Sequence, residues 1–287
     1  MTTSPASDRI QLGAHTLPDR AHSLDRALEG IARAGYRYVG LWNDHAERPL
    51  IPHDATASTI DDVRKQIDSH SLIPRMAFRF PSDPAEKDPA APLKRTVEIA
   101  GALGIPFVIS TGPSPYRRAP HERKRDMLFH RESETYFQVL RTVAPLAESA
   151  RVTVVVKPHM GVTGTGEDLA DLVTLIDHPN VKVCYDAGNI AYYEGLKPEE
   201  DVTACAHLTR AVCIKDHRGE RWNPDFPIPG EGDVDHAAIF GTLLAAGFSG
   251  PCLVERVDGT QKATDMSPDT IDAALTKARI NMEASIP

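Results

Sequence analysis

The chain has 287 residues and a formal net charge of −8, since 40 Asp and Glu outnumber 32 Lys and Arg. An acidic chain is poorly suited to bind nucleic acid or anionic membranes, because phosphate contacts need clustered cations. No apolar run approaches the ~20 residues that cross a bilayer. The first residues, MTTSPASDRIQLG, have no apolar signal core. We therefore expect a cytoplasmic protein without a nucleic-acid or membrane partner.

Short β-rich segments alternate with helical patterns along the chain. The predicted strands cover residues 9–14, 36–42, 73–80, 106–111, 152–158, 181–186, 211–216 and 252–257. Apolar residues at helical spacing predict helices that include residues 24–31, 121–150, 169–176 and 269–284. Gly35, Gly104 and Gly247 each follow a helical pattern and precede a strand, as C-terminal helix caps do.

This alternation predicts a parallel sheet covered by helices. At this length we expect one α/β domain over residues 1–287, a single (β/α)8 TIM barrel. A doubly wound open sheet is the alternative, and it is disfavoured because no GxGxxG follows the first strand. We interpret residues 112–125 and 217–233, which are rich in Pro, Gly and Arg, as active-site loops.

The cysteines predict a reduced interior. No CxxC pair occurs among the four, which are Cys184, Cys205, Cys213 and Cys252, and three of them lie in apolar strand-like runs. Buried free thiols are therefore expected rather than disulfides.

In a TIM barrel the chemistry takes place at the C-terminal ends of the strands. The polar residues at those ends are His15; Trp42 and Asn43; Arg79; Thr111; Lys157 and His159; Asp186 and Asn189; Lys215, Asp216 and His217; and Glu255 and Arg256. Most of the ionisable groups follow the last four strands, so we expect the reactive side there.

Each charged residue also has a structural interpretation. Asp186 suits a turn or a helix cap, Lys215 and Asp216 suit a surface pair, and Lys157 suits a structural ion pair with Asp186 or Glu255. Four charges on adjacent strand ends are harder to explain in this way, because buried ionic clusters are poor stabilising devices. The cluster therefore favours a functional site.

The order of motifs in the second half resembles a known family. A strand ending in a polar residue and PH is followed by YDAGN, IKD, PGEGDVD (229–235) and GFSG (247–250), then by a strand that ends in Glu. This order is similar to the xylose isomerase-like TIM barrels, the sugar phosphate isomerase/epimerase group. That group includes ketose 3-epimerases, hydroxypyruvate isomerases, inosose dehydratases and endonuclease IV-type enzymes.

The resemblance implies one divalent metal, such as Mn, Mg, Co or Zn, bound by Glu, Asp, His and Glu. The Asp matches Asp186 and the last Glu matches Glu255. The first Glu falls on Lys157, the ligand His on Cys213, and a further family His on Asn189. A protonated lysine has no lone pair for a metal, so the chain is interpreted as a divergent member with an altered metal site.

Two hypotheses follow for the altered site. Lys157, Asp186 and Glu255 sum to −1, as a divalent ion with three carboxylates does, so the Lys157 ammonium would replace the metal. In the rival hypothesis His159, Cys213 or His217 joins Asp186 and Glu255 around a metal. A Lys157 Schiff base is a further option, which two nearby carboxylates oppose by retaining the proton.

The resemblance implies proton abstraction beside a carbonyl, through an enediolate, on a keto sugar, sugar acid or keto acid. We expect Glu255 to act as acid or base, Lys157 and Lys215 to stabilise the oxyanion, and His159 to be a second acid/base or an orienting group. The expected substrate-binding residues are Trp42, Arg79, Asn189, Asp216 and His217. Arg117, Arg118 and Arg221 in the loops are further candidates for an acidic substrate group.

Losing one of the family's paired carboxylates favours a one-base lyase, dehydratase or decarboxylase over a two-base epimerase. The alternatives are a metal-dependent ketose epimerase or isomerase with a rearranged site, a non-catalytic sugar-binding barrel, and an endonuclease IV-like nuclease. The acidic charge disfavours the nuclease. Family habit also implies a homo-oligomer.

Overall fold

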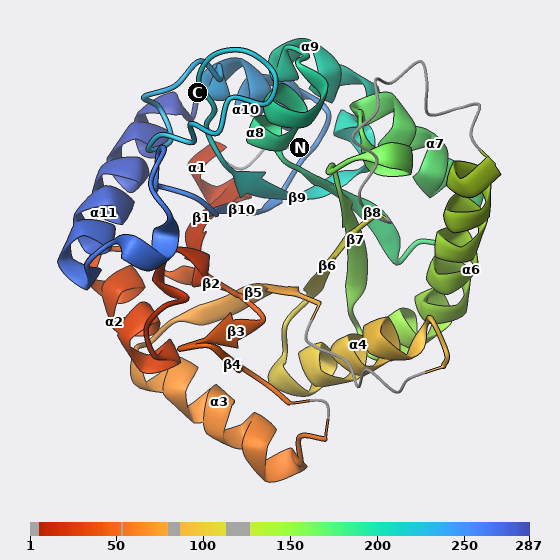
Figure 1. The fold of residues 1–287 in the computed structure, drawn as a ribbon, viewed down its shortest axis with the longest axis horizontal. Helices are drawn as coiled ribbons and strands as arrows, with labels where there is room; N and C mark the ends of the chain where they lie inside the picture. Colours follow the sequence, from red (N-terminus) through yellow and green to blue (C-terminus); the bar gives the residue numbers. More distant parts are fainter. Residues whose placement is uncertain (1–5, 53, 80–86, 113–126) are drawn as a thin grey trace.

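The computed structural model describes residues 6–52, 54–79, 87–112 and 127–287 (Figure 1). Within these residues, eight parallel strands close into a barrel in the order β1-β10-β9-β8-β7-β6-β5-β2. The strands are β1 Ile10–His15, β2 Tyr38–Leu41, β5 Ile73–Phe78, β6 Phe107–Thr111, β7 Thr153–Lys157, β8 Val181–Tyr185, β9 Thr209–Ile214 and β10 Gly250–Val254. The predicted (β/α)8 barrel is therefore confirmed, and each predicted strand overlaps an observed one.

Helices form a ring outside the strands (Figure 1). The α-helices are α1 Ala6–Arg9, α2 Leu24–Arg33, α3 Ala57–Ser69, α4 Ala91–Leu103, α6 Met127–Ser149, α7 Gly166–Ile176, α8 Ala187–Asn189, α9 Pro198–Asp201, α10 His236–Ala245 and α11 Pro268–Ser285. Shorter helical turns are η1 Leu17–Asp19, η2 Gly161–Thr163, η4 Val202–Ala204, η5 Ala206–Leu208 and η6 Ala263–Asp265, and η3 Ile190–Glu194 is a π-helix.

The helix ends agree with the sequence. Gly35, Gly104 and Gly247 have φ angles of 87°, 73° and 89°, the left-handed backbone that glycine adopts without strain. The predicted helix over 121–150 is observed as α6 from Met127, and residues 121–126 lie outside the described part. The antiparallel pair β3 Asp44–His45 and β4 Arg48–Pro49 was not expected.

Alternate residues of each strand face two different layers. The outer faces pack under the helices in the large core that includes Val154, Val156, Val183 and Ile214. The inner faces fill the barrel with Met76, Phe78, Ile109, Val155, Cys184, Ala211, Cys213 and Leu253. In the described residues no helix combines the length and the apolar character that a membrane crossing needs.

Candidate active site

The two-residue period of the strands delivers charge to the barrel mouth. Inner-layer residues Val155, Cys184, Cys213 and Leu253 are each followed two positions later by a charged residue: Lys157, Asp186, Lys215 and Glu255. These four side chains therefore point to the inner face at the C-terminal ends of adjacent strands β7, β8, β9 and β10. We call them the ion cluster.

The ion cluster is closely contacted and buried. Lys157 Nζ lies 2.8 and 2.6 Å from Glu255 Oε1 and Oε2, and 2.9 Å from Asp186 Oδ2. Lys215 Nζ lies 2.7 Å from Glu255 Oε1 and 3.2 Å from Asp186 Oδ2. All four residues are at most 4% exposed. The charge of −1 expected from the sequence counted only Lys157, Asp186 and Glu255. Adding the positive charge of Lys215 makes the ion cluster neutral.

The contacts shift the protonation of the ion cluster. Burial alone would lower the pKa of Lys157, but the Asp186 and Glu255 carboxylates outweigh it and raise that pKa well above its usual value. Burial would raise the pKa of Glu255, but the Lys157 and Lys215 ammonium ions hold it well below its usual value. A Lys157 Schiff base is disfavoured, because it needs the neutral amine.

Asp186 and Asn189 connect the ion cluster to the backbone. Asp186 Oδ1 accepts the Asn189 N–H at 2.9 Å and so caps α8, while its Oδ2 contacts the lysines. Asn189 accepts from Lys215 Nζ at 2.9 Å and donates to the Pro158 carbonyl at 2.7 Å. A Cβ at Gly188 would collide with the Lys215 side chain, so this glycine of YDAGN leaves room for the lysine.

Asp216 organises the loop that carries PGEGDVD. Its carboxylate accepts backbone N–H groups of His217 at 2.8 Å, Gly230 at 2.8 Å, Gly232 at 2.9 Å and Val234 at 3.2 Å. His217 Nε2 donates to the Asn223 carbonyl at 2.9 Å. These contacts give Asp216 and His217 structural partners in the loop, and their predicted substrate contacts remain predictions.

His159 has a partner that the sequence did not indicate. Its Nε2 lies 3.0 Å from the hydroxyl of Tyr193 in η3, and the two rings are 4.5 Å apart. Burial and the charges of Lys157 and Lys215 lower the pKa of His159 to about 4, so the imidazole is neutral at pH 7.

Two cavities open at the C-terminal ends of the strands, and Trp42 lines both. One cavity of about 450 Å³ is lined in part by Glu255, Arg256 and Arg20. The other, of about 490 Å³, includes Phe78, Arg79 and Tyr136 in its lining. The Phe78 ring centre lies 5.3 Å from Lys157 Nζ. Trp42 therefore shares a cavity with Glu255, Arg79 lines the other cavity, and Arg117 and Arg118 are outside the described residues.

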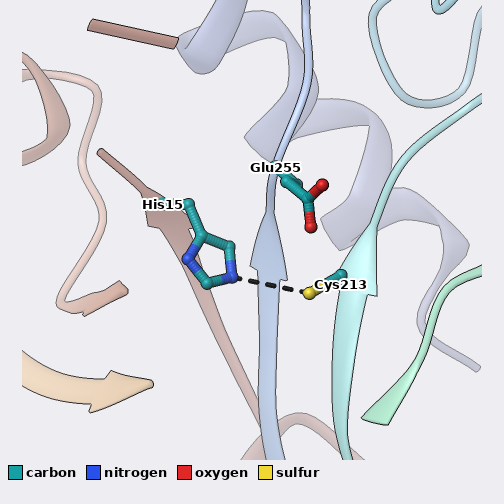
Figure 2. Close-up of side chains that lie close together, drawn as sticks. All are labelled: His15, Cys213 and Glu255. Atoms are coloured by element: carbon teal, nitrogen blue, oxygen red, sulfur yellow. Dashed lines mark hydrogen bonds between the residues drawn. The ribbon is translucent and has the colours of Figure 1, made fainter. Parts of the chain in front are cut away.

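His15, Cys213 and Glu255 form a second group with metal-binding atoms (Figure 2). Their ligand atoms lie within 4.8 Å of one another, and His15 Nε2 lies 3.6 Å from Cys213 Sγ. Burial and the neighbouring Cys184 raise the pKa of Cys213 well above its usual value, so it is a neutral thiol. As expected, all four cysteines are free.

A divalent metal of the family type does not fit this arrangement. Lys157 and Lys215 occupy the oxygens of Asp186 and Glu255 that would face the ion, and ammonium groups repel a cation. At the second group, Glu255 is already engaged by both lysines and Cys213 carries its proton. In the described residues both carboxylates are thus paired with ammonium groups.

Comparison with known proteins agrees with this barrel. The model of the xylose isomerase-like TIM barrel family matches residues 28–277. The chain belongs to that family. An inosose dehydratase from Geobacillus kaustophilus (strain HTA426) is 30% identical over 155 residues, which cover 48% of this chain and 50% of that protein. The chain thus aligns with about half the length of the curated relatives it matches.

Solved structures share the fold at low identity. A D-psicose 3-epimerase from Clostridium cellulolyticum H10, with D-tagatose, has a TM-score of 0.74 and 15% identity, covering 96% of this chain and 99% of that chain. A xylose isomerase-like TIM barrel protein from Mycobacterium smegmatis, in complex with magnesium, has a TM-score of 0.68 and 16% identity, covering 96% and 99%. A similar structure therefore contains a metal.

The sequence pointed to His15 only as a strand-end residue without a role, and it did not indicate Tyr193. His15 ends β1, which the closed barrel places beside β10, so its position as the first strand's inner-face residue was the available signal. Tyr193 lies in a π-helix after YDAGN. No sequence pattern indicates this π-helix, although it begins directly after Asn189, the last residue of YDAGN.

Proposed function

We propose that this protein is an enzyme that removes a proton beside the carbonyl of a polyhydroxylated ketone, and that Lys157 takes the place of the family's metal. The observation that carries the proposal is the position of Lys157 Nζ, 2.9 Å from Asp186 and 2.6 Å from Glu255. The substrate class is a keto sugar or sugar acid, and the reaction class is isomerisation, epimerisation or elimination.

An ammonium group can replace the metal's electrostatic role. Proton loss beside a carbonyl places negative charge on the carbonyl oxygen, and a buried, pre-positioned cation stabilises that charge strongly. Both lysines are held in place by two carboxylates. The carbonyl oxygen of the bound substrate would contact Lys157 Nζ, so its negative charge would develop beside the ammonium group. The lysine would stay protonated.

Elimination of water is the favoured outcome. The ion cluster offers no symmetric pair of free carboxylates, since one family glutamate position is Lys157 and Glu255 is bound by both lysines. The likeness to inosose dehydratases supports the same reaction class. Arg79, which lines one cavity, is suited to a carboxylate or another acidic group on the substrate.

The contacts of Glu255 favour a positioning role rather than the base role expected from sequence. Both of its oxygens accept from ammonium ions, so the carboxylate is engaged in holding the two lysines. A metal-dependent epimerase with a rearranged site remains the second candidate. The close approach of the His15, Cys213 and Glu255 ligand atoms and the magnesium-containing neighbour support it, on condition that Cys213 loses its proton and Glu255 leaves the lysines.

Turnover of defined ketones tests the proposal. Inosose, D-fructose, D-tagatose and D-allulose are incubated with enzyme in D2O, and mass spectrometry follows loss of water and deuterium uptake. Lys157→Met should lower kcat by at least about 100-fold, the cost of removing an oxyanion donor. Lys182→Met, on the same barrel near the start of β8, is the control and should retain activity. Equal activity of the two variants would contradict the role of Lys157.

A further inference from the structure

Proton transfer needs a free lone pair and an available hydrogen, and the ion cluster offers little of either. Glu255 accepts from both lysines. Asp186 accepts the Asn189 N–H with Oδ1 and contacts both lysines with Oδ2. Both carboxylates are thus engaged by the ammonium ions, which leaves the role of the base to another residue.

His159 and Tyr193 are a hydrogen-bonded pair of groups, one able to accept a proton and the other able to donate one. His159 follows Lys157 by two residues, and the His159 Nε2 to Tyr193 Oη distance is 3.0 Å. His159 is neutral at pH 7, since its pKa is about 4, and therefore has one unprotonated ring nitrogen. Burial raises the pKa of Tyr193 to about 12, although the Lys157 charge opposes this, so the phenol keeps its proton.

Hydrogen bonds to backbone carbonyls hold the segments that carry both residues. Asn189 donates to the carbonyl of Pro158, just before His159, at 2.7 Å. Arg221 Nε donates to the Tyr193 carbonyl at 2.6 Å. Tyr193 itself lies in the π-helix η3, a rare turn that is often found at functional sites. The pair is therefore held on the segments that follow β7 and β8, the two strands whose C-terminal ends carry Lys157 and Asp186.

We propose that His159 and Tyr193 are the proton-transfer pair of this site, and that Tyr193 is a catalytic residue. The inference rests on the proposed function. In the resting pair Tyr193 Oη–H donates to the His159 Nε2 lone pair. When the substrate binds, the phenol hydrogen turns to the substrate hydroxyl that will leave, which frees Nε2.

The proton movements balance without a further reactant. His159 Nε2 takes the proton from the carbon beside the carbonyl, and the C–H electrons form the enediolate, whose oxyanion lies at Lys157. The enediolate reforms the carbonyl and expels the hydroxyl from the carbon next to the deprotonated one. This hydroxyl takes the Tyr193 proton and leaves as water. The His159 imidazolium then returns its proton to the Tyr193 phenolate across their hydrogen bond.

A matched pair of tyrosine variants tests the inference in the same D2O assay. Tyr193→Phe should lower kcat by at least about 100-fold with KM within about twofold, the usual range for losing a general acid. Tyr192→Phe removes a hydroxyl from the adjacent residue, whose ring packs on Trp222 and Phe226, and should keep kcat within about twofold. Thermal unfolding of both variants checks that the fold is kept.

The outcomes separate the two proposals. A wild type without turnover on any of the ketones contradicts the proposed function. Turnover by the wild type and equally by Tyr193→Phe overturns the proton-transfer pair and leaves the proposed function standing.

A measurement that needs no turnover covers the resting pair. Nitrogen-15 NMR of the histidine rings should show His159 protonated at Nδ1 and unprotonated at Nε2, with assignment from the His159→Gln spectrum. Tyr193→Phe should shift the His159 Nε2 resonance. A proton on Nε2 in the wild type would overturn the inference, because the imidazole would then be the donor to Tyr193.

Discussion

Asp186 performs two tasks that looked like alternatives in the sequence. One carboxylate oxygen caps α8 by accepting from Asn189, and the other contacts Lys157 and Lys215. Residue type and spacing cannot assign the two oxygens of one carboxylate, so the sequence left the cap and the functional site open. The same applies to Lys157, whose ion pair is both structural and the basis of the proposed chemistry.

At the residue scale, Lys157→Met should destabilise the protein in a pH-dependent way. Removing one partner of a buried ion pair costs about 3–5 kcal/mol, because a charge is left uncompensated. Glu255 has a depressed pKa in the folded wild type, so its stabilisation is present above its unfolded value of 4.5 and is lost as the pH falls toward the depressed value. Urea denaturation should therefore show that Lys157→Met loses unfolding free energy relative to the wild type, with the largest loss at neutral pH and a smaller loss in acid. A loss independent of pH would contradict the ion cluster as its cause.

At the element scale, the PGEGDVD motif is a loop folded around Asp216. Four backbone N–H groups converge on its carboxylate, three of them from Gly230, Gly232 and Val234. Strand positions were predictable because buried parallel strands are continuous apolar runs. The loop was recognised from the sequence only as part of a motif. Its contact residue, Asp216, lies 14 to 18 residues earlier in the chain, and that spacing does not predict a contact.

Gly232→Ala tests this account of the motif. A Cβ at residue 232 would collide with Asp216 Oδ1, so the substitution should cost about 1–3 kcal/mol of unfolding free energy. Gly241→Ala is the control, because no atom lies within 4 Å of a Cβ there and residue 241 is inside α10. That change should be neutral or stabilising by up to about 1 kcal/mol. Equal losses in urea denaturation would show that Asp216 does not constrain the loop.

At the scale of the whole molecule, barrel closure determines which strand ends meet. The period of two places Lys157, Asp186, Lys215 and Glu255 on the inner face, and that much follows from the sequence. The pairing of both lysines with both carboxylates depends on side-chain packing across four strands. The cytoplasmic location and the homo-oligomer remain predictions.

The central claim is that an ammonium group replaces the metal of the family. The most direct test measures the metal content of the purified wild type by inductively coupled plasma mass spectrometry, together with turnover before and after chelation. We expect far less than one divalent ion per chain and turnover that chelation leaves unchanged. A stoichiometric ion, with turnover lost on chelation and restored when the ion is added back, would contradict the claim.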